Sequence, residues 1–158
     1  MKSPELVDLL REFYTERLRL TRRHEAGARL VGQYDFNNAY QYVIARGQSH
    51  LDWLRRALAD LGGSEPDEVA PPQVPGKDQT AVLADDSRLI QAFLDRWRPR
   101  VEQVTDSRQK LMLHVVLGEM SEQKRLFDQA LAGRTDLLGR RTSPSTASGR
   151  VLPTRWIE

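Results

Sequence analysis

Four ionisable residues in this chain have types and positions suited to binding a metal ion. They are Glu16, His50, Glu119 and Glu122, and each lies in a stretch where apolar residues recur every three or four positions. Polar side chains on an apolar helix face cost free energy unless they are paired, hydrogen-bonded or bound to metal. Carboxylate oxygens and an imidazole nitrogen are ligands that iron, manganese and zinc accept. These four residues are therefore the candidate metal ligands.

Three of the candidates belong to two related segments. Gly47-Gln48-Ser49-His50 and Glu119-Met120-Ser121-Glu122 lie 72 positions apart. Four-helix bundles that hold two metals carry Glu-x-x-His on two helices, with the carboxylate and the imidazole one turn apart and pointing inward. The first segment has the His without the Glu, and the second has the Glu without the His. One His and three carboxylates still suit a single Fe, Mn or Zn ion.

The same residues also admit an interpretation without metal. Glu16 and His50 lie 17 positions before and after Gln33, at the centre of a predicted turn, so they are expected level with each other across a hairpin. The two side chains then form a simple hydrogen-bonded pair. By the same count, Arg88 falls near Glu122, and its guanidinium is a candidate replacement for metal charge.

Four helices are expected to position these residues. Ser3-Pro4-Glu5 is typical of a helix start, and Gly62-Gly63 and Gly133 are typical of helix ends. Either Asp35 or Asn37 is a candidate cap for the second helix. The predicted spans are 4–31, 36–61, 81–104 and 107–132, with Pro99 expected to kink the third helix or end it early.

The connections predict how the helices are arranged. Short turns near 32–35 and 105–107 make two antiparallel hairpins, whereas residues 63–79 are rich in Pro, Gly and acids and form a long linker. A linker of this length can return along the bundle and start the third helix parallel to the second. No segment alternates long enough to predict a strand. The sequence therefore predicts an all-α bundle over residues 1–133, followed by an extended basic tail over 134–158.

In helix number, crossover and motif position, residues 4–132 resemble the ferritin-like superfamily, in the style of the small bacterial rubrerythrin-like four-helix proteins. The resemblance implies that Glu16 is the carboxylate of the first helix, His50 the imidazole of the second and Glu119 the carboxylate of the fourth. Gly47 then replaces a bridging Glu, and Glu122 stands where the resemblance implies a His.

The third helix offers no carboxylate at the level where the resemblance implies a metal ligand. Its acids, Asp85, Asp86 and Asp95, are each about one turn from the level at which a ligand is implied. With these ligands missing, the resemblance implies a depleted di-metal centre. Iron or manganese is the expected ion if the residual site is occupied.

Composition excludes several classes of site and partner. The chain has no cysteine, which removes disulfides and thiolate ligands. No apolar stretch approaches the length of a membrane span, and no signal-peptide pattern follows Met1, so the expected location is the cytoplasm. The net charge is only +2, and five arginines in the last 26 residues account for it, so the body is near neutral and nucleic-acid binding is not favoured.

The remaining ionisable residues have simpler interpretations. His24 and His114 fall beside the apolar faces and are expected to be solvated or interfacial. The arginines of the first helix alternate with acids and predict a solvated face. The tail ends in Val151-Leu152-Pro153 and Trp156-Ile157, which suggests docking on the bundle or on a partner subunit, as in a homodimer.

Two function classes follow from these observations. The first is a non-catalytic structural or interaction protein with a depleted di-metal centre. The alternative is a metal-binding protein, mononuclear or with a partial di-iron or di-manganese site, in iron handling or oxidative-stress redox chemistry. Metal content separates the two classes.

Overall fold

The computed structural model describes residues 3–68, 70, 74 and 78–139. These residues form four long α-helices and no strand, which confirms the predicted all-α four-helix bundle. The helices are α1 (Ser3–Ala28), α2 (Tyr34–Asp60), α3 (Gln79–Glu102) and α4 (Ser107–Leu131). Residues 140–158 of the predicted tail (134–158), and with them its suggested docking, lie outside the described residues.

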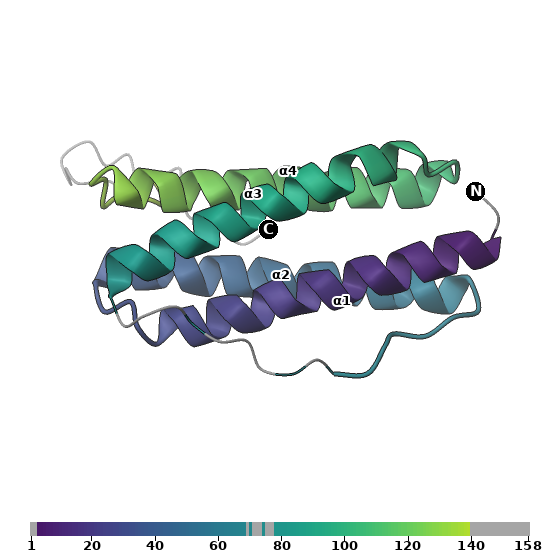
Figure 1. Ribbon diagram of the computed structural model, residues 1–158, viewed down its shortest axis with the longest axis horizontal. Helices are drawn as coiled ribbons and strands as arrows, with labels where there is room; N and C mark the ends of the chain where they lie inside the picture. Colours follow the sequence, from purple (N-terminus) through teal and green to yellow (C-terminus); the bar gives the residue numbers. More distant parts are fainter. Residues whose placement is uncertain (1–2, 69, 71–73, 75–77, 140–158) are drawn as a thin grey trace, which may run out of the picture.

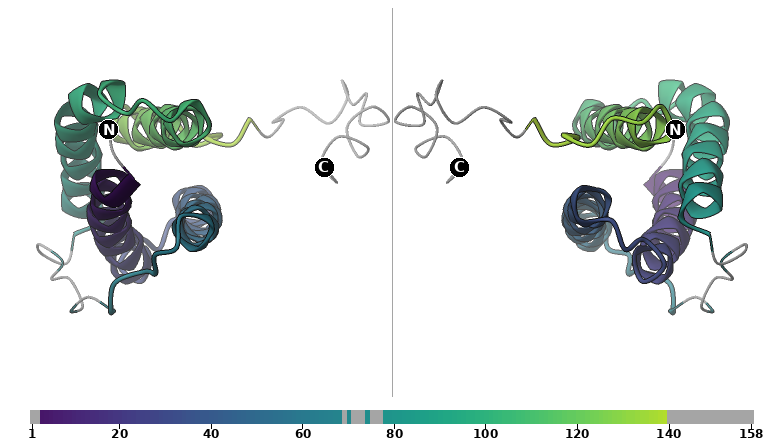
Figure 2. Two further views of the ribbon diagram at one scale, coloured as in Figure 1. Left: turned by 90° about the vertical axis from the view of Figure 1, so that its right-hand side faces the viewer. Right: turned by 90° about the vertical axis from the view of Figure 1, so that its left-hand side faces the viewer.

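The chain direction of each helix can be followed in Figure 1. Helix α2 runs antiparallel to α1, and α4 runs antiparallel to α3. Helix α3 begins at the opposite end of the bundle from the end of α2, so α2 and α3 run parallel. The end-on views in Figure 2 place α1 beside α2 and α3, and the packing is most extensive within the pairs α1–α2 and α3–α4. Two antiparallel hairpins joined by a long connection thus make up the bundle.

The turn between α1 and α2 differs in detail from the prediction. The Gln33 side chain caps α2 by accepting a hydrogen bond from the Phe36 amide at 2.7 Å, because the helix already begins at Tyr34. Asp35 lies within the first turn, where an acid interacts favourably with the helix dipole. Asn37 instead donates to the carbonyl oxygens of Ala28 and Val31, at 3.0 and 3.1 Å. It therefore ties the end of α1 to the start of α2.

The other helix ends follow local sequence chemistry. Asp106 caps α4 by accepting from the Gln109 amide at 3.0 Å. Gly62 and Gly133 follow α2 and α4 with φ of 81° and 95°, a conformation that favours glycine. Pro99 lies in the last turn of α3, which ends three residues later at Glu102.

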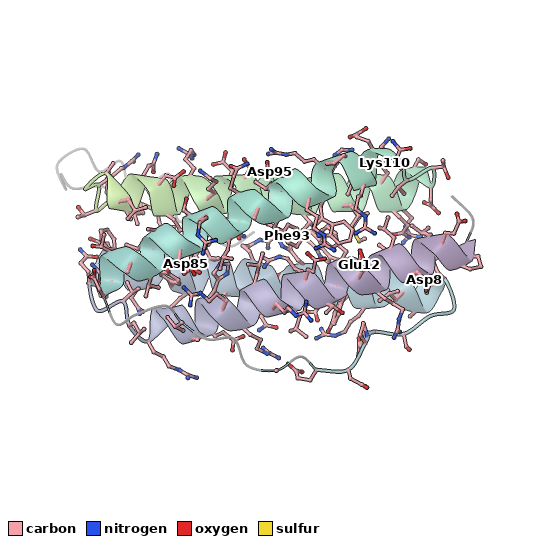
Figure 3. All side chains as sticks on the ribbon, viewed as in Figure 1. Asp8, Glu12, Asp85, Phe93, Asp95 and Lys110 are labelled. Carbon is pink, nitrogen blue, oxygen red and sulfur yellow. The ribbon has the colours of Figure 1, made fainter. Side chains whose placement is uncertain are left out.

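Aromatic side chains of α1 and α3 pack against one another in the core. The ring of Phe13 on α1 meets the ring of Trp97 on α3 edge-on, with centroids 4.9 Å apart, and the ring of Phe93 at 5.2 Å. Figure 3 shows Phe93 between α3 and α1, whereas Asp95 lies on the outer side of α3. Leu137, beyond α4, also belongs to the buried core.

No helix in the described part of the chain is long and apolar enough to cross a membrane.

Candidate functional site: a buried arginine–histidine–glutamate network

His50 is fully buried on α2 and is hydrogen-bonded at both ring nitrogens. Arg17 on α1 donates from Nε to Nδ1 of His50 at 3.2 Å. A guanidinium has no acceptor, so Nδ1 must accept and the imidazole proton resides on Nε2. Nε2 lies 3.0 Å from Oε1 of Glu119 on α4, to which it donates. The imidazole thus joins three helices as a neutral bridge.

Glu119 completes the network at the edge of the bundle. Arg46 on α2 donates from Nε and Nη2 to the two carboxylate oxygens of Glu119, at 2.7 and 2.9 Å. Arginine suits this bidentate geometry better than lysine does. Burial works to raise the pKa of Glu119, but the hydrogen bonds from Arg46 and His50 outweigh it and hold that pKa below its ordinary value. Burial and the charge of Arg17 lower the pKa of His50 to about 4, so the imidazole is neutral near pH 7. The network therefore contains a carboxylate, a neutral imidazole and two guanidinium cations.

The guanidinium of Arg17 occupies space that Gly47 leaves open. A Cβ built on Gly47 would lie 3.3 Å from Nη2 of Arg17 and 2.7 Å from Oγ1 of Thr21. Thr21, one turn along α1, accepts from Nη1 of Arg17 at 3.2 Å. Arg17 is fully buried, and burial lowers its pKa to about 10, opposed by the charge of Glu119. Gly47, where the resemblance implies a bridging carboxylate, is thus the position at which the two helices admit an arginine.

A second ionic cluster joins α1, α2 and α3. Arg23 donates to Asp86 at 3.2 Å and to Asp85 at 2.8 Å, and the Tyr40 hydroxyl donates to Asp86. Burial raises the pKa of Asp86 to about 6, although the hydrogen bonds from Tyr40 and Arg23 oppose this. One expectation is corrected here. Arg17 and Arg23, at 0% and 3% exposure, lie off the solvated face predicted for the first helix. Asp86 is fully buried as well.

His24 is a further correction, because it lies in the core and not in solvent. Its ring is fully buried between Tyr40 and Phe127, with centroids 6.3 and 5.7 Å away. Burial, together with the charges of Arg17 and Arg23, lowers its pKa to about 3. Neither of its ring nitrogens has a hydrogen-bond partner among the described residues.

The other two predicted ligands do not join His50. Glu16 turns toward α3, where it accepts from Nε1 of Trp97 at 3.2 Å and pairs with Arg96 at 3.1 Å. Glu122 is exposed and pairs with Arg125 at 2.7 Å. The predicted Glu16–His50 pair is therefore replaced by Arg17 with His50.

Arg88 does not take the predicted place of metal charge. It is exposed and pairs with Asp85 on its own helix. The arginine beside the central histidine and glutamate is Arg17 instead. It reaches them because α1 presents position 17, and not position 16, to the interior.

The residues at the centre do not fit a di-metal site. Of the four candidate ligands, only His50 and Glu119 meet, and the lone pair of His50 at Nδ1 already accepts from Arg17. Among the described residues, no group of three or more His, Asp or Glu side chains is arranged to hold a metal ion. Whether a single ion binds after rearrangement stays a prediction for metal analysis.

The spacing of buried residues on α1 could have revealed Arg17 and His24. The buried positions Leu6, Leu10, Phe13, Arg17, Leu20 and His24 follow steps of three and four. This pattern indicates an inward arginine and an inward histidine as directly as it indicates the apolar residues. No model of a known protein family and no curated protein sequence matches the chain.

Proposed function

We propose that this protein is a ferritin-like bundle whose centre is held by hydrogen-bonded ionic side chains instead of metal, and that it serves as a non-catalytic structural or interaction protein. The observation that carries the proposal is the bond from Nε of Arg17 to Nδ1 of His50 in the space beside Gly47. A fixed cation there supplies positive charge next to Glu119. The bundle therefore needs no ion to offset that carboxylate.

The state of the central groups supports a non-catalytic role. A general base near neutral pH needs a free lone pair and a pKa close to 7. His50 offers neither, because Nδ1 accepts from Arg17 and its pKa is about 4. Glu119 is ionised but is held by Arg46 and His50. Each of these side chains is thus hydrogen-bonded to another side chain of the network.

The alternative function, a mononuclear or partial di-iron or di-manganese protein in iron handling or redox chemistry, has one observation in its favour. His50 and Glu119 lie adjacent and offer a nitrogen and oxygens of the kind these metals accept. An ion could use them only if Arg17 left Nδ1 or the proton left Nε2. The alternative therefore requires a rearranged network.

Elemental analysis of the full chain, purified without chelator, tests the proposal. We expect iron and manganese well below one ion per chain in the wild type, and no rise in the melting temperature when Fe(II) or Mn(II) is added. His50→Ala and Glu119→Ala should leave the metal content unchanged. Stoichiometric iron or manganese that disappears in His50→Ala would establish the alternative function.

For the interaction role, we propose self-association through α4 as a homodimer. Leu111 and Val115 lie one turn apart on its outer face, with 66% and 42% of their surface exposed. Gly118 continues the same face without a side chain, and nothing described lies within 4 Å of a Cβ built there. Apolar residues gathered on an exposed helix face favour contact with a partner.

A further inference from the structure

The outer face of α4 carries a row of exposed residues that differ in size and charge. At steps of three and four positions, this α4 row consists of Arg108, Leu111, Val115, Gly118 and Glu122. The charged side chains at its two ends are 82% and 66% exposed. Figure 2 shows α3 and α2 on two sides of α4 and no other described helix on the outer side. The α4 row is therefore open to a partner along its whole length.

The two halves of the α4 row are complementary to each other about Val115. Arg108 lies seven positions before Val115, and Glu122 lies seven positions after it. Leu111 lies four positions before Val115, and Gly118 lies three positions after it. A second copy turned by a two-fold axis at Val115 therefore brings cation to anion and a large side chain to a small one, on both sides of the axis. A two-fold interface requires this kind of self-complementary surface.

A hollow at Gly118 can receive an apolar side chain. It has a volume of about 410 Å³ and is lined by Arg98, Pro99, Glu102, His114, Leu117 and Gly118. A Cβ built on Gly118 meets nothing described within 4 Å. Leu111 of the same chain cannot fill the hollow, because seven residues of helix separate the two positions by about 10 Å. Leu111 of a second copy, turned about Val115, is level with it.

The charges at the ends of the α4 row are only weakly engaged within the chain. The acid nearest to Arg108 is Asp60 on α2, and the two side chains are 3.8 Å apart. Glu122 pairs with Arg125 one turn along α4 at 2.7 Å, and both of these side chains are more than half exposed. Exposed pairs of this kind contribute little to stability. Arg108 and Glu122 can therefore pair with charges of a partner at small cost.

We propose that two copies of the chain associate in antiparallel orientation through the α4 row, around a two-fold axis at Val115. Leu111 of each copy enters the hollow at Gly118 of the partner subunit, and Arg108 pairs with Glu122 of the partner subunit. Val115 packs on the partner's Val115 at the axis. The inference rests on the self-association proposed above and adds its orientation, its register and the residues that recognise the partner. One helix from each copy makes a small contact, so the dimer should dissociate at micromolar concentrations.

Single cysteines in the full-length protein test the register, because the chain has no cysteine of its own. Val115→Cys should form a disulfide between two copies under mild oxidation, and a mixture of Leu111→Cys with Gly118→Cys should form the mixed disulfide. Leu111→Cys alone should stay at the background given by Gln48→Cys, an exposed position of α2. Its two copies would lie about 10 Å apart along the helices, beyond the reach of a disulfide. Efficient cross-linking of Leu111→Cys to itself would overturn the antiparallel register and leave self-association through α4 intact.

Charge reversal tests the pairing at the ends of the α4 row in sedimentation equilibrium. Arg108→Glu should raise the dissociation constant of the dimer roughly tenfold, because two attractive pairs become repulsive. Adding Glu122→Arg reverses both charges and should return the constant to within roughly threefold of wild type. Glu122→Arg with Arg19→Glu on α1 has the same net charge and should stay weakened. A dimer that the double reversal does not restore would overturn the α4 register alone, whereas a wild type that is monomeric at all concentrations would overturn self-association itself.

Discussion

Arg17 donates from Nε to Nδ1 of His50 across the α1–α2 hairpin, at 3.2 Å. The guanidinium thereby covers the imidazole lone pair that a metal ion would need. Because both side chains are fully buried, the pair belongs to the core and not to the surface. The stability of the bundle should therefore depend on Arg17 and His50, although residues of these ionisable types often suggest a catalytic or metal-binding role.

Truncation of Arg17 should be costly. Arg17→Ala removes a buried cation, leaves Nδ1 of His50 unpaired and opens a cavity, so we expect a loss of about 3 kcal/mol in the free energy of unfolding. Arg17→Met fills much of the volume and should cost less, on the order of 1–2 kcal/mol. Urea unfolding at pH 7 measures both. Arg19→Ala, at an exposed position of the same helix, should stay within about 0.5 kcal/mol of wild type, and an equal loss there would contradict the prediction.

Gly47→Ala should destabilise the protein, although alanine is the better helix former. The added Cβ would lie 2.7 Å from Oγ1 of Thr21, which is bonded to the Arg17 carbonyl and guanidinium. Overpacking of this kind costs about 1–3 kcal/mol. Gly118→Ala is the matched control on α4, where the Cβ meets nothing described within 4 Å, and should raise stability by up to about 1 kcal/mol. Thermal unfolding of both variants tests whether their stabilities change in opposite directions relative to wild type. A Gly47→Ala variant that is more stable than wild type would show that Thr21 moves away from the added Cβ at little cost.

Removal of the Tyr40 hydroxyl should weaken the second cluster. Tyr40→Phe leaves an oxygen of the fully buried Asp86 without its donor, at a cost of about 1–3 kcal/mol. Tyr42→Phe, two positions along α2 with 48% exposure, should be nearly neutral. Denaturant melts compare the two variants. Similar stability of both proteins would mean that the Tyr40–Asp86 bond contributes little.

The sequence predicts the fold well because helix signals are local. Periodic apolar residues, capping residues and terminal glycines located four helices to within about three residues, and the length of the linker predicted the crossover. On α2 the positions with three- and four-residue spacing, Tyr40, Val43, Gly47, His50 and Leu54, are all buried. Each of these features depends on residues close together in the chain.

The central network was predicted less well than the fold. On α1 and α4 the side chains that face the interior lie one residue away from the predicted ones. On α4 the buried residues include Leu113, Val116, Met120, Gln123 and Phe127, and Glu119 and Glu122 lie beside this inward face. Residue type points to the carboxylates of Glu16 and Glu122, whereas the neighbouring side chains of Arg17 and Gln123 are the buried ones. The position on α4 that corresponds to His50 is then Gln123, 73 residues later instead of 72. Pairing between helices depends on which side chains fit together, and the spacing alone does not contain this information.

Self-association through α4 should depend on Leu111 and Val115. Leu111→Glu with Val115→Glu places two charges on the proposed contact and should convert a dimer to a monomer in sedimentation equilibrium at neutral pH. Because both side chains are exposed in the single chain, the free energy of unfolding of the monomer should change little. Arg19→Glu, an exposed change on α1, is the control for charge alone. A wild-type chain that is monomeric at all concentrations would rule out the dimer.

The two buried histidines should make stability depend on pH. The folded-state pKa is about 4 for His50 and about 3 for His24, lowered first by burial and then by nearby arginines. In the unfolded chain both values return to about 6.5. Below pH 6.5 the unfolded state therefore binds protons that the folded state does not, and stability decreases as the pH falls toward 4.

Asp86 acts in the opposite direction over part of this range. Burial raises its folded-state pKa to about 6, above an unfolded value of about 3.9, so between these values the folded state binds the extra proton. The combined effect of the two histidines and Asp86 is a net loss on the order of 2 kcal/mol in the free energy of unfolding when the pH falls from 7 to 5. Urea unfolding at the two pH values measures this difference. His24→Leu should reduce it, whereas His114→Leu, at a 43% exposed side chain on α4, should leave it unchanged. Equal stability of the wild type at both pH values would contradict the neutral, buried state of His24 and His50.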